Sequence, residues 1–216
     1  LQARQGQYAP FLSYLQQYQL RHALTPSQVA DWLQVALWAG QDDEVVKVWR
    51  RYQVYMPLPA RGTAAAAQAL RNQKQWQASL TLWQQALSQA PDSDDYRIGY
   101  IKTLADARKD GEALSEARRL VAEQASVAHL QTLSYVYLRL GKSWDQLLVD
   151  TQILDREPQN KAALASLMAT LTRNRIDSPA LDLANSVELT PAEKRNLQLN
   201  AAAELVRLAD TPSREE

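Results

Sequence analysis

A repeating pattern of about 34 residues constrains this sequence more than any other feature, and it is clearest in residues 75–91. Apolar residues recur there in steps of three and four, which places them on one face of a helix. They are Trp76, Leu80, Trp83, Ala86 and Leu87. Pro91 ends the predicted helix, because its ring cannot join the hydrogen-bond ladder.

The pattern recurs along the chain at nearly constant intervals. Its copies begin at Pro26, Ala60, Asp94, Val127 and Lys161, so the intervals are 34, 34, 33 and 34 residues. Residues 25–28, Thr-Pro-Ser-Gln, suit a helix start, with Thr as the cap, Pro in the first turn and Gln three residues after the cap. Paired helices with this period are typical of tetratricopeptide repeats. The sequence therefore predicts an all-α, right-handed solenoid of helical hairpins.

We expect a single solenoid domain over residues 1–216. Its predicted parts are a partial repeat at 1–25, repeats at 26–59, 60–93, 94–126, 127–160 and 161–189, a capping helix at 190–210 and a tail at 211–216. Turns between paired helices are expected at Gly40, Gly111 and Gly141. The copy at 127–160 departs from the pattern, because Gln146 and Asp150 stand where an alanine and an aromatic residue are usual.

Small residues dominate the predicted helix that begins at Ala60. Its alanines allow neighbouring helices to approach closely, and tryptophans of the next helix can fill the remaining space. The tryptophans expected to serve packing are Trp32, Trp49, Trp76 and Trp83. Trp38 is different, because it falls on the face that the first helices of the repeats share.

That shared face is the candidate binding surface of the chain. Its predicted residues are Gln34, Trp38, Gln68, Arg71, Asn72, Lys102, Asp106, Gln131, Tyr135 and Arg139, with Arg173 continuing the row. The set lacks the cluster of lysines and arginines that would hold the terminal carboxylate of a peptide. Aromatic rings and amides suit hydroxyl-rich ligands, because rings cover the apolar faces of sugars and amides bridge hydroxyl groups. An ordinary solvated surface is the alternative interpretation.

Charge and cysteine content exclude several classes of protein. The chain has 24 basic and 24 acidic residues, whereas a nucleic-acid binder normally carries a basic excess, so no nucleic-acid partner is expected. Cysteine is absent, which excludes disulfides and thiol catalysis. No apolar run reaches the roughly 18 residues that a membrane helix needs. Because the chain starts at Leu1 rather than methionine, we expect a mature protein or a fragment.

Residue patterns typical of catalysis or metal binding are missing from the sequence. His22 and His129 are far apart and lack metal-ligand spacing, and there is no phosphate loop or nucleophile elbow. The sequence therefore predicts no enzyme activity, no cofactor and no metal site. Two acidic clusters, at 42–44 and 92–95, follow turns. We expect them to stabilise helix N-termini, with cation binding or acid–base chemistry as the alternative.

Several segments resemble a known protein family beyond the repeat pattern. Residues 30–42 (ADWLQVALWAGQD), 58–62 (LPARG), 75–91 and 203–208 (AELVRL) are similar to the N-terminal periplasmic region of the PgaA/HmsH-like outer-membrane porins. These porins export poly-β-1,6-N-acetyl-D-glucosamine. The close match covers roughly residues 26–106 and a short piece near the end.

The resemblance implies a periplasmic scaffold that is part of an outer-membrane protein and acts in biofilm formation. The implied partners are the partly de-N-acetylated polysaccharide, the periplasmic polysaccharide deacetylase, and a C-terminal β-barrel of the same protein that this chain does not contain. A generic protein–protein adaptor that binds a peptide or helix is the alternative function. The N-terminal aromatic residues Tyr8, Phe11, Tyr14 and Tyr18 lie on more than one helix face, so they predict either a docking surface or contact with a preceding helix.

Overall fold

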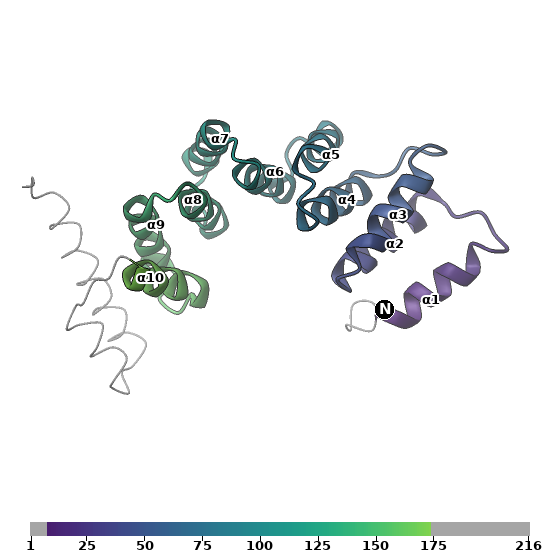
Figure 1. Cartoon of the computed structure of the whole chain (residues 1–216), viewed down its shortest axis with the longest axis horizontal. Helices are drawn as coiled ribbons and strands as arrows, with labels where there is room; N and C mark the ends of the chain where they lie inside the picture. The colour runs from purple at the N-terminus through teal and green to yellow at the C-terminus, as the bar shows by residue number, and fades with distance from the viewer. Residues whose placement is uncertain (1–7, 174–216) are drawn as a thin grey trace, which may run out of the picture. The chain divides into compact units, whose positions relative to one another are not determined.

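The computed structural model of the chain describes residues 8–173, apart from the side chains of Met168 and of residues 171–173 (Figure 1). Within residues 8–173 the backbone forms ten α-helices and no strand. The helices are α1 (Tyr8–Tyr18), α2 (Pro26–Trp38), α3 (Asp42–Tyr52), α4 (Ala60–Asn72), α5 (Trp76–Gln89), α6 (Asp94–Asp106), α7 (Asp110–Glu123), α8 (Val127–Leu140), α9 (Ser143–Arg156) and α10 (Lys161–Arg173). The predicted all-α fold is confirmed.

Helix starts follow the period of the sequence. Helices α2, α4, α6, α8 and α10 begin at the five residues from which the period was counted. The chain divides into two compact units, unit 1 (Leu1–Lys109) and unit 2 (Asp110–Glu216). The assignment of 1–216 to a single domain stays a prediction, and the expected capping helix at 190–210 and tail at 211–216 lie outside the described residues.

The start of α2 shows how local sequence sets a helix boundary. The side chain of Thr25 accepts a hydrogen bond from the Gln28 backbone N–H at 3.2 Å, and the Thr25 N–H donates to the Gln28 side chain at 2.9 Å. This is the predicted capping box, and Pro26 occupies the first turn, where its missing N–H costs nothing.

Turns between paired helices contain residues in the left-handed conformation at matching positions. They are Gly40, Lys74, Arg108 and Gly141, with φ of 71°, 61°, 59° and 72°. The spacing of these four residues repeats the period of the helix starts. Gly111 was expected in such a turn, but this prediction is wrong: Gly111 lies in the first turn of α7, and Arg108 takes the left-handed position instead.

Lys74 and Arg108 lead to a stability prediction. A side chain in the left-handed region costs energy that glycine does not pay, so Lys74→Gly and Arg108→Gly should each stabilise the fold by about 0.5–1 kcal/mol. Denaturant unfolding of both variants measures the change. Lys109→Gly, one residue later at an exposed position, serves as the control and should not stabilise. Destabilisation by Lys74→Gly would show that its side chain contributes contacts worth more than the backbone strain.

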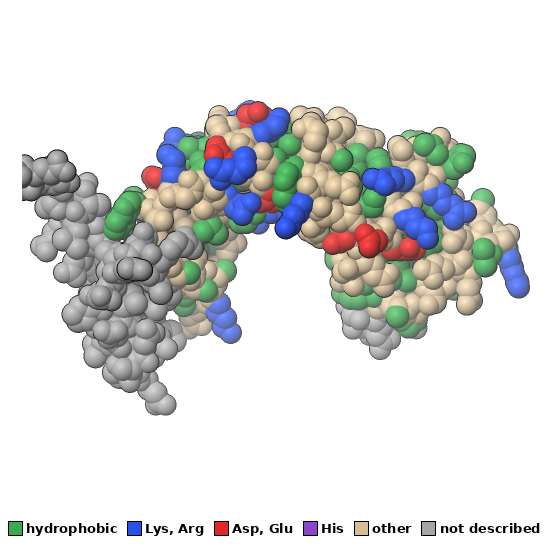
Figure 2. All heavy atoms as spheres, in the orientation of Figure 1, with side chains coloured by type: hydrophobic (Ala, Val, Ile, Leu, Met, Phe, Trp, Pro, Cys, Tyr) green, Lys and Arg blue, Asp and Glu red, His purple; other side chains and the backbone are tan. Residues whose placement is uncertain are grey.

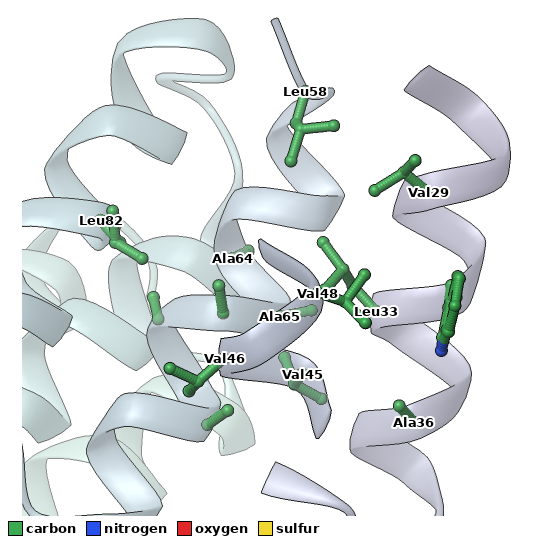
Figure 3. Packing of buried hydrophobic residues seen from close by; sticks show 14 of the residues in the cluster. Val29, Leu33, Ala36, Val45, Val46, Val48, Leu58, Ala64, Ala65 and Leu82 are labelled. Carbon is green, nitrogen blue, oxygen red and sulfur yellow. The ribbon is translucent and has the colours of Figure 1, made fainter. Parts of the chain in front are cut away.

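Buried alanines of α4 form the centre of the core of unit 1. Ala64, Ala65, Ala66, Ala67 and Ala69 are buried, and they pack with valines and leucines of the neighbouring helices. Figure 3 shows Ala64 and Ala65 near Val45, Val46 and Val48 of α3. The close approach extends to Gly62, where an added Cβ would lie 3.1 Å from Ala30 of α2. The prediction that small residues permit tight packing is therefore confirmed.

Trp83 joins α5 to α6 through a shape match with a glycine. Its indole N–H donates to the Thr103 hydroxyl at 3.0 Å, and Thr103 in turn donates to the Gly99 carbonyl at 2.7 Å. A Cβ at Gly99 would lie only 2.4 Å from the Trp83 ring. Trp32 and Trp83 are buried as predicted, whereas Trp49 and Trp76 are half-buried. In residues 8–173, no helix has both the length and the apolar character needed to cross a membrane.

Candidate functional site

The predicted binding residues divide between the two units. Helices α2, α4 and α6 of unit 1 carry Gln34, Trp38, Gln68, Arg71, Asn72, Lys102 and Asp106. Helix α8 of unit 2 carries Gln131, Tyr135 and Arg139. The two groups are therefore described separately. Arg173 is the last residue of α10, and its side chain lies outside the described residues.

An aromatic pair marks one end of the group in unit 1. Trp38 is 53% exposed at the C-terminal end of α2, as expected for a tryptophan outside the core. Its ring centroid lies 6.5 Å from that of Tyr8 on α1, with the planes tilted by 44°. Gln34, one turn earlier on α2, is half-buried. Trp38 therefore presents an exposed aromatic surface one helical turn from an amide.

Amide side chains continue the group on α4. Gln68 donates to the Asn72 side-chain oxygen at 2.8 Å, and Asn72 donates to a carboxylate oxygen of Asp42 at 3.1 Å. Asp42 lies in the first turn of α3, so this chain of bonds connects two helices. The bonds hold Gln68 and Asn72 in fixed orientations, which lowers the entropy cost of binding a ligand with these amides.

Charged residues between α4 and α6 are paired with one another. The Arg71 Nε donates to the Asp106 carboxylate at 2.7 Å, and their side chains are 17% and 7% exposed. Lys102 lies close by: burial lowers the pKa of its ammonium group, Arg71 lowers it further and Asp106 opposes the shift. Asp106 was expected to face a ligand, but its carboxylate is buried and bound by Arg71, which leaves it little contact with a ligand.

Helix α8 places three predicted residues on one face in unit 2. Gln131, Tyr135 and Arg139 follow at intervals of four residues, so they project from the same side of the helix. Gln131 and Tyr135 are half-buried and Arg139 is exposed. This set repeats the amide and the aromatic ring of unit 1 on a smaller scale.

The acidic clusters lie where helix stabilisation requires them. Asp42, Asp43 and Glu44 occupy the first turn of α3, and Asp94 and Asp95 occupy the first turn of α6. Carboxylates at these positions meet the positive end of the helix dipole, so the predicted placement at helix N-termini is confirmed for these five residues. Neither N-cap residue, Gln41 or Ser93, accepts a side-chain cap hydrogen bond. Within the described residues, no group of three His, Cys, Asp or Glu side chains could hold a metal ion.

Two residues of the site in unit 1 were not predicted. Tyr8 was predicted to belong either to a docking surface or to a contact with a preceding helix, and its ring contact with Trp38 of α2 has no signal in the local sequence. Asp42 was assigned to the helix start, and its bond to Asn72 spans 30 residues, close to one period. The periodic register could therefore have indicated that Asp42 and Asn72 are neighbours.

Figure 2 shows basic and acidic side chains interspersed on the visible face, without a large patch of one sign.

Known structures place the chain in a class of fold. It is similar to MamA, a helical protein of the tetratricopeptide-repeat type. The structure of MamA 41-end from Desulfovibrio magneticus RS-1 matches with a TM-score of 0.57 and 14% identity, over 86% of this chain and 97% of that chain. A MamA RS-1 ArsTM double mutant gives a TM-score of 0.56 and 15% identity over 87% of this chain and 97% of that one. These likenesses show the fold alone, and the fold is that of tetratricopeptide repeats.

Sequence comparison is more specific. The chain is 41% identical over all of its 216 residues to the poly-beta-1,6-N-acetyl-D-glucosamine export protein of Escherichia coli strain K12, and equally to that of strain O157:H7. The resemblance inferred from the sequence is confirmed. The chain spans 25% of the length of these curated relatives. No family model matches the chain.

Proposed function

We propose that this chain is a periplasmic scaffold segment of a poly-β-1,6-N-acetyl-D-glucosamine exporter, and that it guides the polysaccharide. The observation that carries the proposal is the 41% identity to such export proteins along the whole chain. The fold supports it, because helical repeats present extended surfaces suited to long ligands. The side chains of α2 and α4 in unit 1 supply the chemistry.

The proposed stacking platform for a sugar ring is the exposed ring of Trp38, supported by its half-buried neighbour Tyr8. The side-chain amides of Gln34, Gln68 and Asn72 would donate hydrogen bonds to the hydroxyl and acetamide oxygens of the sugar, which can accept them. The contacts are few and lie open to water, so we expect a dissociation constant on the order of 1 mM, equivalent to about 4 kcal/mol. Weak contacts suit a polymer that must move along the surface.

Charge favours acetylated over deacetylated sugar units near α6. Asp106 is engaged by Arg71, while Lys102 and Arg71 carry positive charges that repel a glucosamine ammonium group. Attraction for an ammonium group would come instead from the Asp42 carboxylate, which accepts a hydrogen bond from Asn72. We therefore place acetylated units at α6 and any deacetylated unit beside Asp42.

We further propose that exposed apolar side chains dock the periplasmic deacetylase. Tyr14, Leu20 and Tyr55 in unit 1 are strongly exposed, and aromatic side chains are frequent at the centres of protein interfaces. We assign no catalytic step to the chain, because its proposed role is to hold and guide.

A substitution in the aromatic pair tests sugar binding. Trp38→Ala should raise the dissociation constant of an acetylated β-1,6-N-acetylglucosamine oligomer about tenfold. We expect the lost stacking contact to contribute about 1.4 kcal/mol of binding free energy, which corresponds to a tenfold change. The readout is the NMR signal of the side-chain amides of Gln68 and Asn72, because tryptophan fluorescence would itself be lost with the residue.

Trp144→Ala is the matched control, since Trp144 is a partly exposed tryptophan of α9 in unit 2. It should leave unchanged the dissociation constant of the oligomer that is measured from the Gln68 and Asn72 signals. Equal affinity in Trp38→Ala and the parent would contradict the stacking role of Trp38. Shifts produced by purified deacetylase but not by the oligomer would leave protein docking as the remaining function.

A further inference from the structure

A buried polar network connects three helices of unit 2. Asp150 of α9 is 1% exposed, and its two carboxylate oxygens accept hydrogen bonds of 2.6 Å from Ser134 of α8 and from Ser166 of α10. Gln146 of α9, which is 2% exposed, donates to the Ser166 hydroxyl at 2.7 Å. The carboxylate therefore lies at the point where α10 meets the hairpin of α8 and α9.

At the matching position of unit 1 stands a tryptophan, Trp83 of α5, whose indole N–H donates to the Thr103 hydroxyl of α6. There Trp83 packs against Gly99, and in unit 2 Asp150 bonds to Ser166; each contact joins residues sixteen positions apart. The fold thus accepts a tryptophan at this place, and packing alone does not require an acid. Asp150 was noted in the sequence as a departure from the repeat pattern, and the structure shows that the departure is a complete hydrogen-bonded network.

We propose that Asp150 makes the docking of α10 on α9 sensitive to pH, so that α10 is held more firmly in mildly acidic than in neutral solution. A buried carboxyl group is easier to keep neutral than charged, because the interior solvates the charge poorly. Protonated Asp150 can remain bonded to both serines, since their hydroxyl groups can rotate to donate or accept.

The direction of the effect follows from the proton balance. Burial raises the pKa of Asp150, and the hydrogen bonds from Ser134 and Ser166 oppose that rise without cancelling it. The closed state therefore binds more protons than an open state in which Asp150 meets water at its ordinary pKa of about 3.9. The docking of α10 is then most stable at acid pH and weakens as pH rises towards the raised pKa of Asp150. Over that range the equilibrium constant for opening increases by up to tenfold for each pH unit.

Several other titratable groups lie on the helices packed around Asp150. On α8, His129 is bonded to the Gln124 carbonyl and Tyr137 accepts from Arg118 of α7, while Arg139 is exposed. The remaining groups on α8, α9 and α10 whose side chains the structure describes are Tyr135, Asp145, Asp155, Arg156 and Lys161. Burial and the two serines account for the shift in the pKa of Asp150, without a contribution from these charges.

Hydrogen exchange of the whole chain tests the proposal. Protection factors of the α10 amides, corrected for the intrinsic pH dependence of exchange, should fall from pH 4.5 to pH 7.5 in the parent. Asp150→Asn keeps a neutral hydrogen-bonding group in place, so it should abolish that fall. Asp155→Asn changes an exposed aspartate of the same helix and should behave like the parent.

A direct titration remains decisive if Asp150→Asn fails to fold. The carboxyl carbon of Asp150 in the parent, followed by NMR, should titrate above the pH of about 3.9 that is typical of an exposed aspartate. Titration at or below that value, α10 protection that does not change with pH in the parent, or an unchanged pH dependence in Asp150→Asn would each overturn the proposal.

Discussion

Ala86→Arg is expected to destabilise unit 1 by about 3–5 kcal/mol, because it places an uncompensated charge inside a packed helix interface. Ala86 lies on α5, is fully buried and belongs to the core cluster around the alanines of α4. Denaturant unfolding followed by tryptophan fluorescence measures the change, since five of the six tryptophans precede residue 110.

The neighbouring position supplies the control for Ala86→Arg. Gln85 is exposed on the same helix, so Gln85→Arg adds the same side chain in water and should change stability by about 0.5 kcal/mol or less. Parent-like unfolding of Ala86→Arg would mean that α5 does not bury this face.

Gly99→Ala has the second largest expected effect. Its new Cβ would lie 2.4 Å from the Trp83 ring, so α6 or the indole must move. Overpacking of this kind costs about 1–3 kcal/mol, and the displaced indole would also lose its bond to Thr103. Thermal or denaturant unfolding of the variant gives the value.

A double-mutant cycle separates overpacking from a loss of helix propensity. Trp83→Leu removes the ring that an alanine at position 99 would meet, so Gly99→Ala in that background should be neutral or stabilising, because alanine favours helix over glycine. An equal cost in both backgrounds would show that the contact with Trp83 is not the cause.

Much of the fold could be predicted from the sequence, because its strongest signals are local and repeated. The capping residues at Thr25 and Gln28 and the period of the helix starts need no tertiary information. The left-handed turns were only half predicted. Glycine indicated Gly40 and Gly141, but Lys74 and Arg108 take the same conformation with side chains that give no such signal.

The candidate site was harder to predict, because its contacts join different helices. The exposure of Trp38 followed from its helix face, but the pairing of Arg71 with Asp106 depends on the distance between α4 and α6. Their separation of 35 residues is close to one period, so the register could have indicated this pair too. The Asp150 network combines Gln146 and Asp150, which the sequence marked as departures, with serines that it did not.

The proposed function requires the aromatic and amide residues of α2 and α4 to bind poly-β-1,6-N-acetyl-D-glucosamine. Titration of an acetylated oligomer into the isotope-labelled chain, followed by NMR, tests it most directly. We predict that the Trp38 indole and the side-chain amides of Gln34, Gln68 and Asn72 shift together, with one dissociation constant on the order of 1 mM. Unchanged signals from all four side chains at about ten times that concentration would contradict the claim.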